Sequence, residues 1–123
     1  MNESILTSIK KLLNIEEDCT DFDEEVIVHI NSVFSDLYQL GVGPDGGFAI
    51  IDKDTAWKEL LSDDKQLNNV KTYMYLRVKL VFDPPLSGSV ISSMEREVNK
   101  LEWRINIAAE SSNVKSEVEI QNE

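Results

Sequence analysis

The chain is poor in the side chains that bind metals or form cross-links. Cys19 is the only cysteine and His29 the only histidine among 123 residues. A single cysteine excludes an intrachain disulfide and a paired-cysteine metal or redox site. A zinc site would have to be built almost wholly from carboxylates, which zinc rarely accepts. The sequence therefore predicts no metal ion and no cofactor.

Long hydrophobic runs and positive charge are also scarce. No apolar run approaches the length of about 20 residues that spans a bilayer, and "MNESILTSIKKLL" lacks the basic-then-apolar order of a secretory signal. We therefore expect a protein made in the cytoplasm with no membrane partner. Twelve basic and 23 acidic side chains give a formal net charge of −11. This charge argues against a nonspecific DNA binder, because phosphate contacts need a basic face.

The remaining composition is that of one folded domain. The chain is 41% hydrophobic and 28% charged, and its length suits a single core. Its apolar residues recur mostly at helical spacing, which predicts an all-α fold, a small bundle of about four to five helices. We expect one helical domain over residues 1–107. Residues 108–123 lose the apolar stripe and the aromatics, which predicts a flexible C-terminal tail.

The first segment, "ESILTSIKKLL", predicts a short amphipathic helix. Lys10 and Lys11 fall between its apolar positions, so we expect both lysines to point outward. The expected apolar face consists of Ile5, Leu6, Ile9, Leu12 and Leu13.

A second and longer helix is predicted over residues 22–40. Asp21 or Asp23 can cap its first amide groups, and Gly41 follows it where a left-handed terminating residue is expected. Its apolar stripe is made of Val26, Ile30, Val33, Leu37 and Leu40.

The next stretch, "GVGPDGGFAIID", is rich in turn residues and predicts a loop. Within it, residues 48–51 are β-prone and predict one short extended piece. "TAWKELL" then predicts one or two helical turns capped by Thr55.

The stretch "YLRVKLVF" alternates apolar and polar residues and, taken alone, favours a strand. A wider window favours a helix over residues 65–82, because apolar residues then form two adjacent stripes. A helix apolar around most of its girth belongs in the centre of a core or between subunits. The stripes are Leu67, Val70, Met74, Val78 and Val81, and Tyr73, Leu76 and Leu80.

Two prolines, Pro84 and Pro85, must end that helix. Ser87 or Ser89 can cap the next one, which is predicted over residues 87–105. Two long amphipathic helices joined by a prolyl turn form an αα-hairpin. The stripe of its second helix is Val90, Met94, Val98, Leu101 and Ile105.

No catalytic site emerges from the sequence. The acidic segment, residues 16–25, carries seven carboxylates, but it lacks the glycine and the final glutamate of a calcium-binding loop. "GVGPDGG" has no lysine and hydroxyl residue of a phosphate-binding loop after it. His29 has no candidate nucleophile beside it in the pattern. We therefore predict that the chain is not an enzyme.

Charge and aromatic residues instead indicate contact surfaces. The acidic segment has no base, whereas residues 65–82 contain four bases and no acid, so the two segments can pair within one subunit or across two. Trp103 lies off the apolar stripe and either rims the core or faces another chain. The predicted interface residues are Glu16, Glu17, Asp18, Asp21, Asp23, Lys71, Tyr73, Tyr75, Arg77, Lys79 and Trp103.

Three short motifs resemble one known family. They are Lys71-Thr72-Tyr73, Phe82-Asp83-Pro84-Pro85 and Leu101-Glu102-Trp103-Arg104, and the likeness extends from the first helix to Ile107. The chain is similar to the head-tail connector proteins, also called adaptor or head-completion proteins, of tailed bacteriophages and prophages of Gram-positive bacteria.

The resemblance implies a structural virion protein made in the host cytoplasm and located at the head-tail interface. Its partners would be the portal protein, a stopper or tail-completion protein, and other copies of itself. It implies a dodecameric ring on the portal, with phage DNA passing through without specific binding, and a monomer in isolation. The alternative is a free acidic helical protein that regulates or inhibits another protein through the same exposed apolar surface.

Overall fold

The computed structural model describes residues 3–121, which form five helices. Within this range there is no strand, and one isolated antiparallel bridge joins Ser4 to Ala56. The all-α prediction is therefore confirmed. The helices are α1 (Ile5–Leu12), α2 (Asp23–Gln39), α3 (Trp57–Leu60), α4 (Asp64–Phe82) and α5 (Gly88–Gln121).

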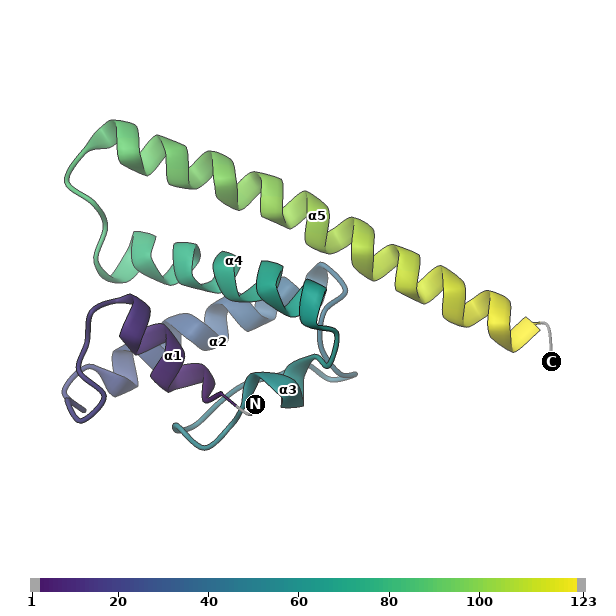
Figure 1. Cartoon of the computed structure of the whole chain (residues 1–123), viewed down its shortest axis with the longest axis horizontal. Coiled ribbons are helices and arrows are strands. Elements are labelled where there is room, and N and C mark those ends of the chain that lie inside the picture. The colour runs from purple at the N-terminus through teal and green to yellow at the C-terminus, as the bar shows by residue number, and fades with distance from the viewer. Residues whose placement is uncertain (1–2, 122–123) are drawn as a thin grey trace.

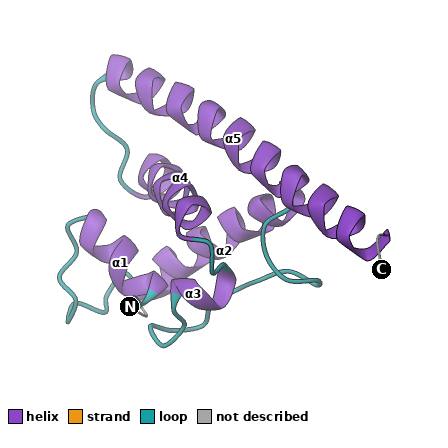
Figure 2. Cartoon of the chain, turned by 45° about the vertical axis from the view of Figure 1, so that its right-hand side comes forward, coloured by secondary structure: helices purple, strands orange, loops and turns teal. Residues whose placement is uncertain are grey.

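Helix α4 lies in the middle of the arrangement (Figure 1). Helices α1 and α2 pack on one side of it, and α5 runs along the other side. The view in Figure 2 shows the same order with α4 seen nearly end-on. The central position explains why the α4 sequence is apolar around so much of its girth.

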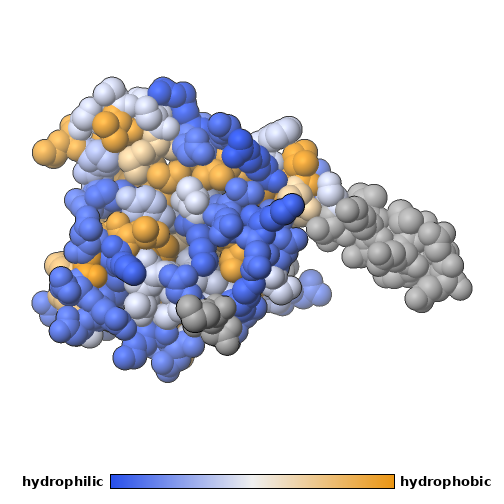
Figure 3. All heavy atoms as spheres, in the orientation of Figure 1, coloured by the Kyte–Doolittle hydropathy of each residue, from blue (hydrophilic) through white to orange (hydrophobic). Residues whose placement is uncertain are grey.

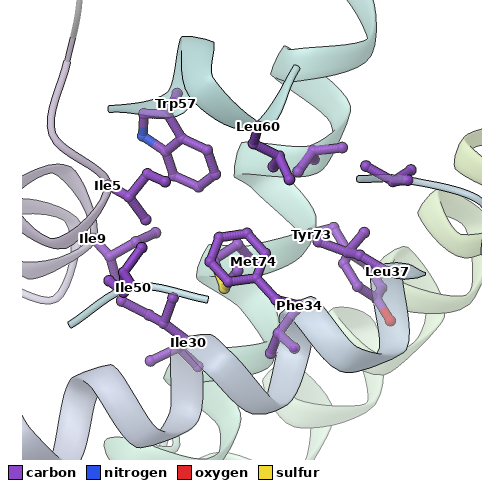
Figure 4. Close-up of a cluster of buried hydrophobic side chains, with 14 of the residues drawn as sticks. Ile5, Ile9, Ile30, Phe34, Leu37, Ile50, Trp57, Leu60, Tyr73 and Met74 are labelled. Carbon is purple, nitrogen blue, oxygen red and sulfur yellow. The ribbon is translucent and has the colours of Figure 1, made fainter. Parts of the chain in front are cut away.

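The core lies between α1, α2, α3 and α4 (Figure 4), and Val98, Leu101 and Ile105 of α5 also belong to it. Trp57 and Phe34 are almost completely buried there, and Tyr73 and Met74 of α4 are fully buried. The Trp57 indole nitrogen donates to Ser8 Oγ at 2.7 Å, which satisfies the one polar atom of that side chain. Each large apolar side chain buried here contributes about 1.5 to 3 kcal/mol.

The expected hairpin is present, with α4 ending at Phe82 and α5 beginning at Gly88. The wider window thus gave the correct helical assignment for α4, and the strand-like alternation of "YLRVKLVF" did not determine the structure. Three residues assigned to apolar stripes are nevertheless exposed: Leu12 (49%), Val81 (62%) and Val90 (46%). They lie at helix ends, where the partner helix no longer covers the stripe.

The last helix was predicted to end at residue 105, but α5 continues to Gln121. The flexibility predicted for residues 108–123 stays a prediction. Residues 122 and 123 of the predicted tail lie outside the described range. Packing also continues past the predicted boundary, since Ala109 is buried and the Asn106 amide donates to Leu40 O at 3.2 Å. A helix satisfies its own backbone hydrogen bonds, so it continues without an apolar stripe.

The short extended piece predicted at residues 48–51 does not pair as a strand. The Asn31 side chain of α2 takes the place of a neighbouring strand instead. Its amide nitrogen donates to Ile50 O at 2.9 Å, and its Oδ1 accepts from Ile50 N at 2.8 Å. Ile50 is thereby held in the core, where its side chain is 2% exposed.

One predicted helix cap is also corrected. Thr55 was expected to cap α3, but Ala56 holds that position. Ala56 offers no side-chain acceptor, and the Glu59 carboxylate accepts its backbone N–H at 2.6 Å. Either Ser87 or Ser89 was predicted to cap α5. Ser87 holds the position directly before its first helical residue.

Gly41 lets α5 approach the end of α2, and this approach can be tested. It has a φ of +96°, and a Cβ added there would lie 2.9 Å from the Cβ of Ala109. Gly46 has a similar φ of +88° with nothing within 4 Å of such a Cβ.

We expect Gly46→Ala to lose about 1–2 kcal/mol from backbone strain alone, and Gly41→Ala to lose clearly more because α5 must also move. Urea unfolding of both variants measures the difference. Equal losses would contradict the close contact between α5 and the end of α2.

Candidate assembly surfaces

Lys10 is buried, with 3% of its surface exposed, so the prediction that it points outward is wrong. Its ammonium donates to Glu17 O at 3.1 Å and to Cys19 O at 2.7 Å. The same nitrogen lies 2.9 Å from Asp23 Oδ1. A buried ammonium needs such acceptors, and the chain after α1 folds back to supply them. Lys11 is exposed as expected.

This arrangement gives the acidic segment a defined position. Asp23 is the first residue of α2 and pairs with Lys10, while Phe22 holds the cap position without a side-chain cap. The predicted cap by Asp21 or Asp23 is therefore wrong, because Asp23 is taken up by Lys10. The other carboxylates of the segment are exposed: Glu16, Glu17, Asp18, Asp21, Glu24 and Glu25.

The described residues contain no group of three or more potential ligands that could hold a metal ion. The acidic segment is thus a charged surface in the structure. Phe22 adds an apolar element to it, since its side chain is 45% exposed and its ring contacts that of Phe82 edge-on, with centroids 5.7 Å apart.

A polar network joins α2, α4 and α5. Tyr73 donates its hydroxyl to Glu102 Oε1 at 2.8 Å and accepts from Arg77 Nη1 at 2.5 Å. The other end of the Arg77 guanidinium donates to Asp36 Oδ2 at 2.5 Å. Burial of the phenol, together with the hydrogen bond to Glu102, raises the pKa of Tyr73 to about 12.

Three of the four basic residues of α4 find partners inside the chain, and the fourth, Lys65, is exposed. Lys71 pairs with Glu3 at 3.1 Å, and Lys79 pairs with Asp83 at 2.8 Å. Arg77 belongs to the polar network described above. No ion pair in the described part of the chain joins α4 to the acidic segment.

Two predicted interface aromatics lie in opposite environments. Tyr73 is fully buried and is not part of the surface of the subunit, because it fills the core on the inner side of α4. Trp103 is 67% exposed, so the structure places it on the outer side of α5 and not on the rim of the core. Tyr75 is half-buried against the core.

The sequence prediction missed the basic surface of α5. Arg96, Lys100 and Arg104 are all exposed and lie four residues apart, which places them on one face of the helix. No ion pair to a carboxylate is found for any of the three among the residues described. The spacing was visible in the sequence, but only the structure shows that these bases lack the internal partners that Lys71, Arg77 and Lys79 of α4 have.

The surface also has a shallow apolar groove at the end of the hairpin where the connection joins α4 to α5. Leu76 of α4 and Val90 and Met94 of α5 line it, and Ser89, Ser93 and Glu97 form its edge. Leu86, in the connection beside it, is fully exposed. Figure 3 shows apolar atoms at this end of the molecule, at the upper left.

No helix in the described range is both long and apolar enough to cross a membrane.

The role of Lys10 can be tested against its neighbour in the sequence. Lys10→Met removes the donor shared by two carbonyls and Asp23, so we expect the free energy of unfolding to fall by about 1–3 kcal/mol. Lys11→Met, at an exposed site, should change it by less than about 0.5 kcal/mol. Urea unfolding measures both, and a Lys10→Met variant as stable as Lys11→Met would contradict the anchoring role.

The Tyr73 network predicts a loss of stability in alkali. The pKa in the fold, about 12, lies above the ordinary value of 10.0, so the protonated phenol stabilises the fold. Its contribution is complete below pH 10 and is lost as the pH rises towards 12. We expect Tyr73→Phe to make the fall in stability over this range shallower than in the parent. Chemical unfolding across this pH range provides the measurement, and a slope identical to the parent's in Tyr73→Phe would refute the assignment.

Comparison with known proteins gives one match. Residues 5–112 match a family described as phage connector protein. No curated protein and no solved structure matches the chain. The matched region extends from the first residue of α1 into α5 beyond Ala109, and it includes all of the packed core. The earlier resemblance to connector proteins is confirmed, and the chain belongs to the phage connector protein family, a family of structural phage proteins.

Proposed function

We propose that the chain is a subunit of a ring that docks beneath the portal of the phage head. The ring extends the DNA channel and offers an attachment surface to the stopper or tail-completion protein. The observation that carries this proposal is the family match over residues 5–112, because it spans the whole packed fold and not a local motif.

The distribution of exposed groups supports a protein with several partners. The outer face of α5, the acidic segment and the connected end of the hairpin are three surfaces with exposed aromatic or apolar side chains. Exposed aromatic residues next to charged ones are typical of protein interfaces. A ring subunit needs two surfaces for its neighbours and others for the portal and the tail.

The net charge is also consistent with a channel protein. A charge of −11 repels DNA phosphate, so the genome can pass without sticking to the wall. In this proposal the ring is dodecameric, like the portal. The protein is made in the host cytoplasm, stays monomeric in isolation and becomes part of the virion at the head-tail interface.

Deletion of the gene from the phage tests this proposal. We expect lysates to contain separate heads and tails and no joined virions, and a plasmid copy of the gene to restore joining. Purified protein mixed with portals from the same phage should add a ring to them, seen by electron microscopy.

Joined virions in the deletion strain would refute the connector role. Normal tails on every head, together with capture of the protein by a non-virion enzyme in a one-to-one complex, would favour the alternative of a free acidic regulator.

A further inference from the structure

The outer face of α5 carries a basic stripe, defined here as Arg96, Lys100 and Arg104. Eight residues separate its ends, which is about 12 Å along a helix. Trp103 lies beside the stripe and is 67% exposed, and Ile107, one turn further on, is 42% exposed. The face opposite the stripe holds the buried residues Leu101 and Ile105, so the basic stripe points away from the body of the subunit.

The acidic segment has the complementary composition. Six of its carboxylates are exposed, and no lysine or arginine lies within ion-pair distance of them in the described part of the chain. Phe22 lies among them with 45% of its surface exposed. Each of the two surfaces thus combines charge of one sign with one exposed aromatic ring.

The two surfaces are on opposite sides of the same subunit. Helix α5 runs along one side of α4, whereas the connection between α1 and α2 lies on the other side, at the lower left of Figure 1. Within one chain they cannot meet. Between copies they can meet head to tail, and a repeated head-to-tail contact forms a ring when its rotation closes.

We propose that the basic stripe and Trp103 of one copy dock onto the acidic segment and Phe22 of the next copy; this inference rests on the proposed function, in which the subunits form a ring. The occupant of the stripe is a second copy of this chain because the complementary charge and aromatic residue are present on it. The apolar contact supplies affinity, and the charges set the register and the rate of association.

Duplex DNA is a weaker candidate for the stripe. Three cations on a chain of net charge −11 make few phosphate contacts against an overall repulsive field. Glu95 and Glu97 flank Arg96 in the sequence, which further reduces the attraction of a polyanion. The acidic segment of another copy instead presents its exposed carboxylates at one defined place.

A matched pair of single variants gives the first test. Lys100→Glu changes the centre of the basic stripe, and Lys65→Glu makes the same change at an exposed lysine of α4. We expect Lys100→Glu to raise the concentration needed to decorate half of the portals about tenfold, because an attraction becomes a repulsion. Lys65→Glu should leave it unchanged. Circular dichroism verifies that both variants remain folded.

A charge-swap experiment gives the second test. One variant carries Arg96→Glu, Lys100→Glu and Arg104→Glu; the other carries Glu16→Lys, Glu17→Lys and Asp21→Lys. Each alone should fail to form rings on portals. An equimolar mixture should form them, because in alternating copies every contact again joins opposite charges. A mixture that fails while both variants are folded and the parent assembles would overturn the inference.

A measurement without portals separates this inference from the proposed function, at a protein concentration high enough for transient contacts between copies that are otherwise monomeric. Carbodiimide joins a lysine amine to a carboxylate in direct contact, and mixing unlabelled and ¹⁵N-labelled protein identifies links between copies. We expect links from Lys100 to the acidic segment.

Such links in a parent that never decorates portals would uphold the contact and refute the portal role. Rings formed equally well by the triple-Glu variant would uphold the ring and refute this contact. This holds whether or not that variant binds duplex DNA less well than the parent in a gel shift.

Discussion

The burial of α4 between α2 and α5 is the constraint on which the rest of the structure depends. A helix covered on both sides must satisfy every polar group that it carries inward. Tyr73 is fully buried, and its hydroxyl is held by Glu102 of α5 and Arg77 of α4. Because Arg77 also binds Asp36 of α2, one network sets the positions of all three helices. The alignment of α5 on the core, and so the direction of its outer face, follows from it.

A second buried polar group shapes the opposite side of the molecule. Lys10 needs acceptors within reach of α1, and it finds them in two backbone carbonyls of the acidic segment and in Asp23. The segment is therefore folded against the helix pair, although its composition is that of a solvated loop. Its remaining carboxylates face solvent and, with Phe22, form a surface of defined shape.

The internal ion pairs decide which charges are left for partners. Lys71, Arg77 and Lys79 of α4 are occupied by Glu3, Asp36 and Asp83, so these bases contribute chiefly to the fold. The bases on the outer face of α5 have no such partners within the described chain. In this protein of the phage connector family, the exposed carboxylates of the acidic segment and the exposed bases of α5 thus lie on opposite sides of the subunit, as the proposed head-to-tail contact needs.

Local pattern alone determined the helices, their order and the family. Apolar spacing at 3.6 residues, a double proline and a terminating glycine are properties of neighbouring residues, so α2, α4 and the start of α5 were predictable to within one or two residues. The burial of Lys10, the pairing of Asn31 with Ile50 and the continuation of α5 to Gln121 were not, because each involves partners distant in sequence or a helix that packs on few neighbours. The same limit applies to the surfaces. Sequence identifies every charge, but only the tertiary structure decides which charges neutralise one another and which remain free to meet another chain.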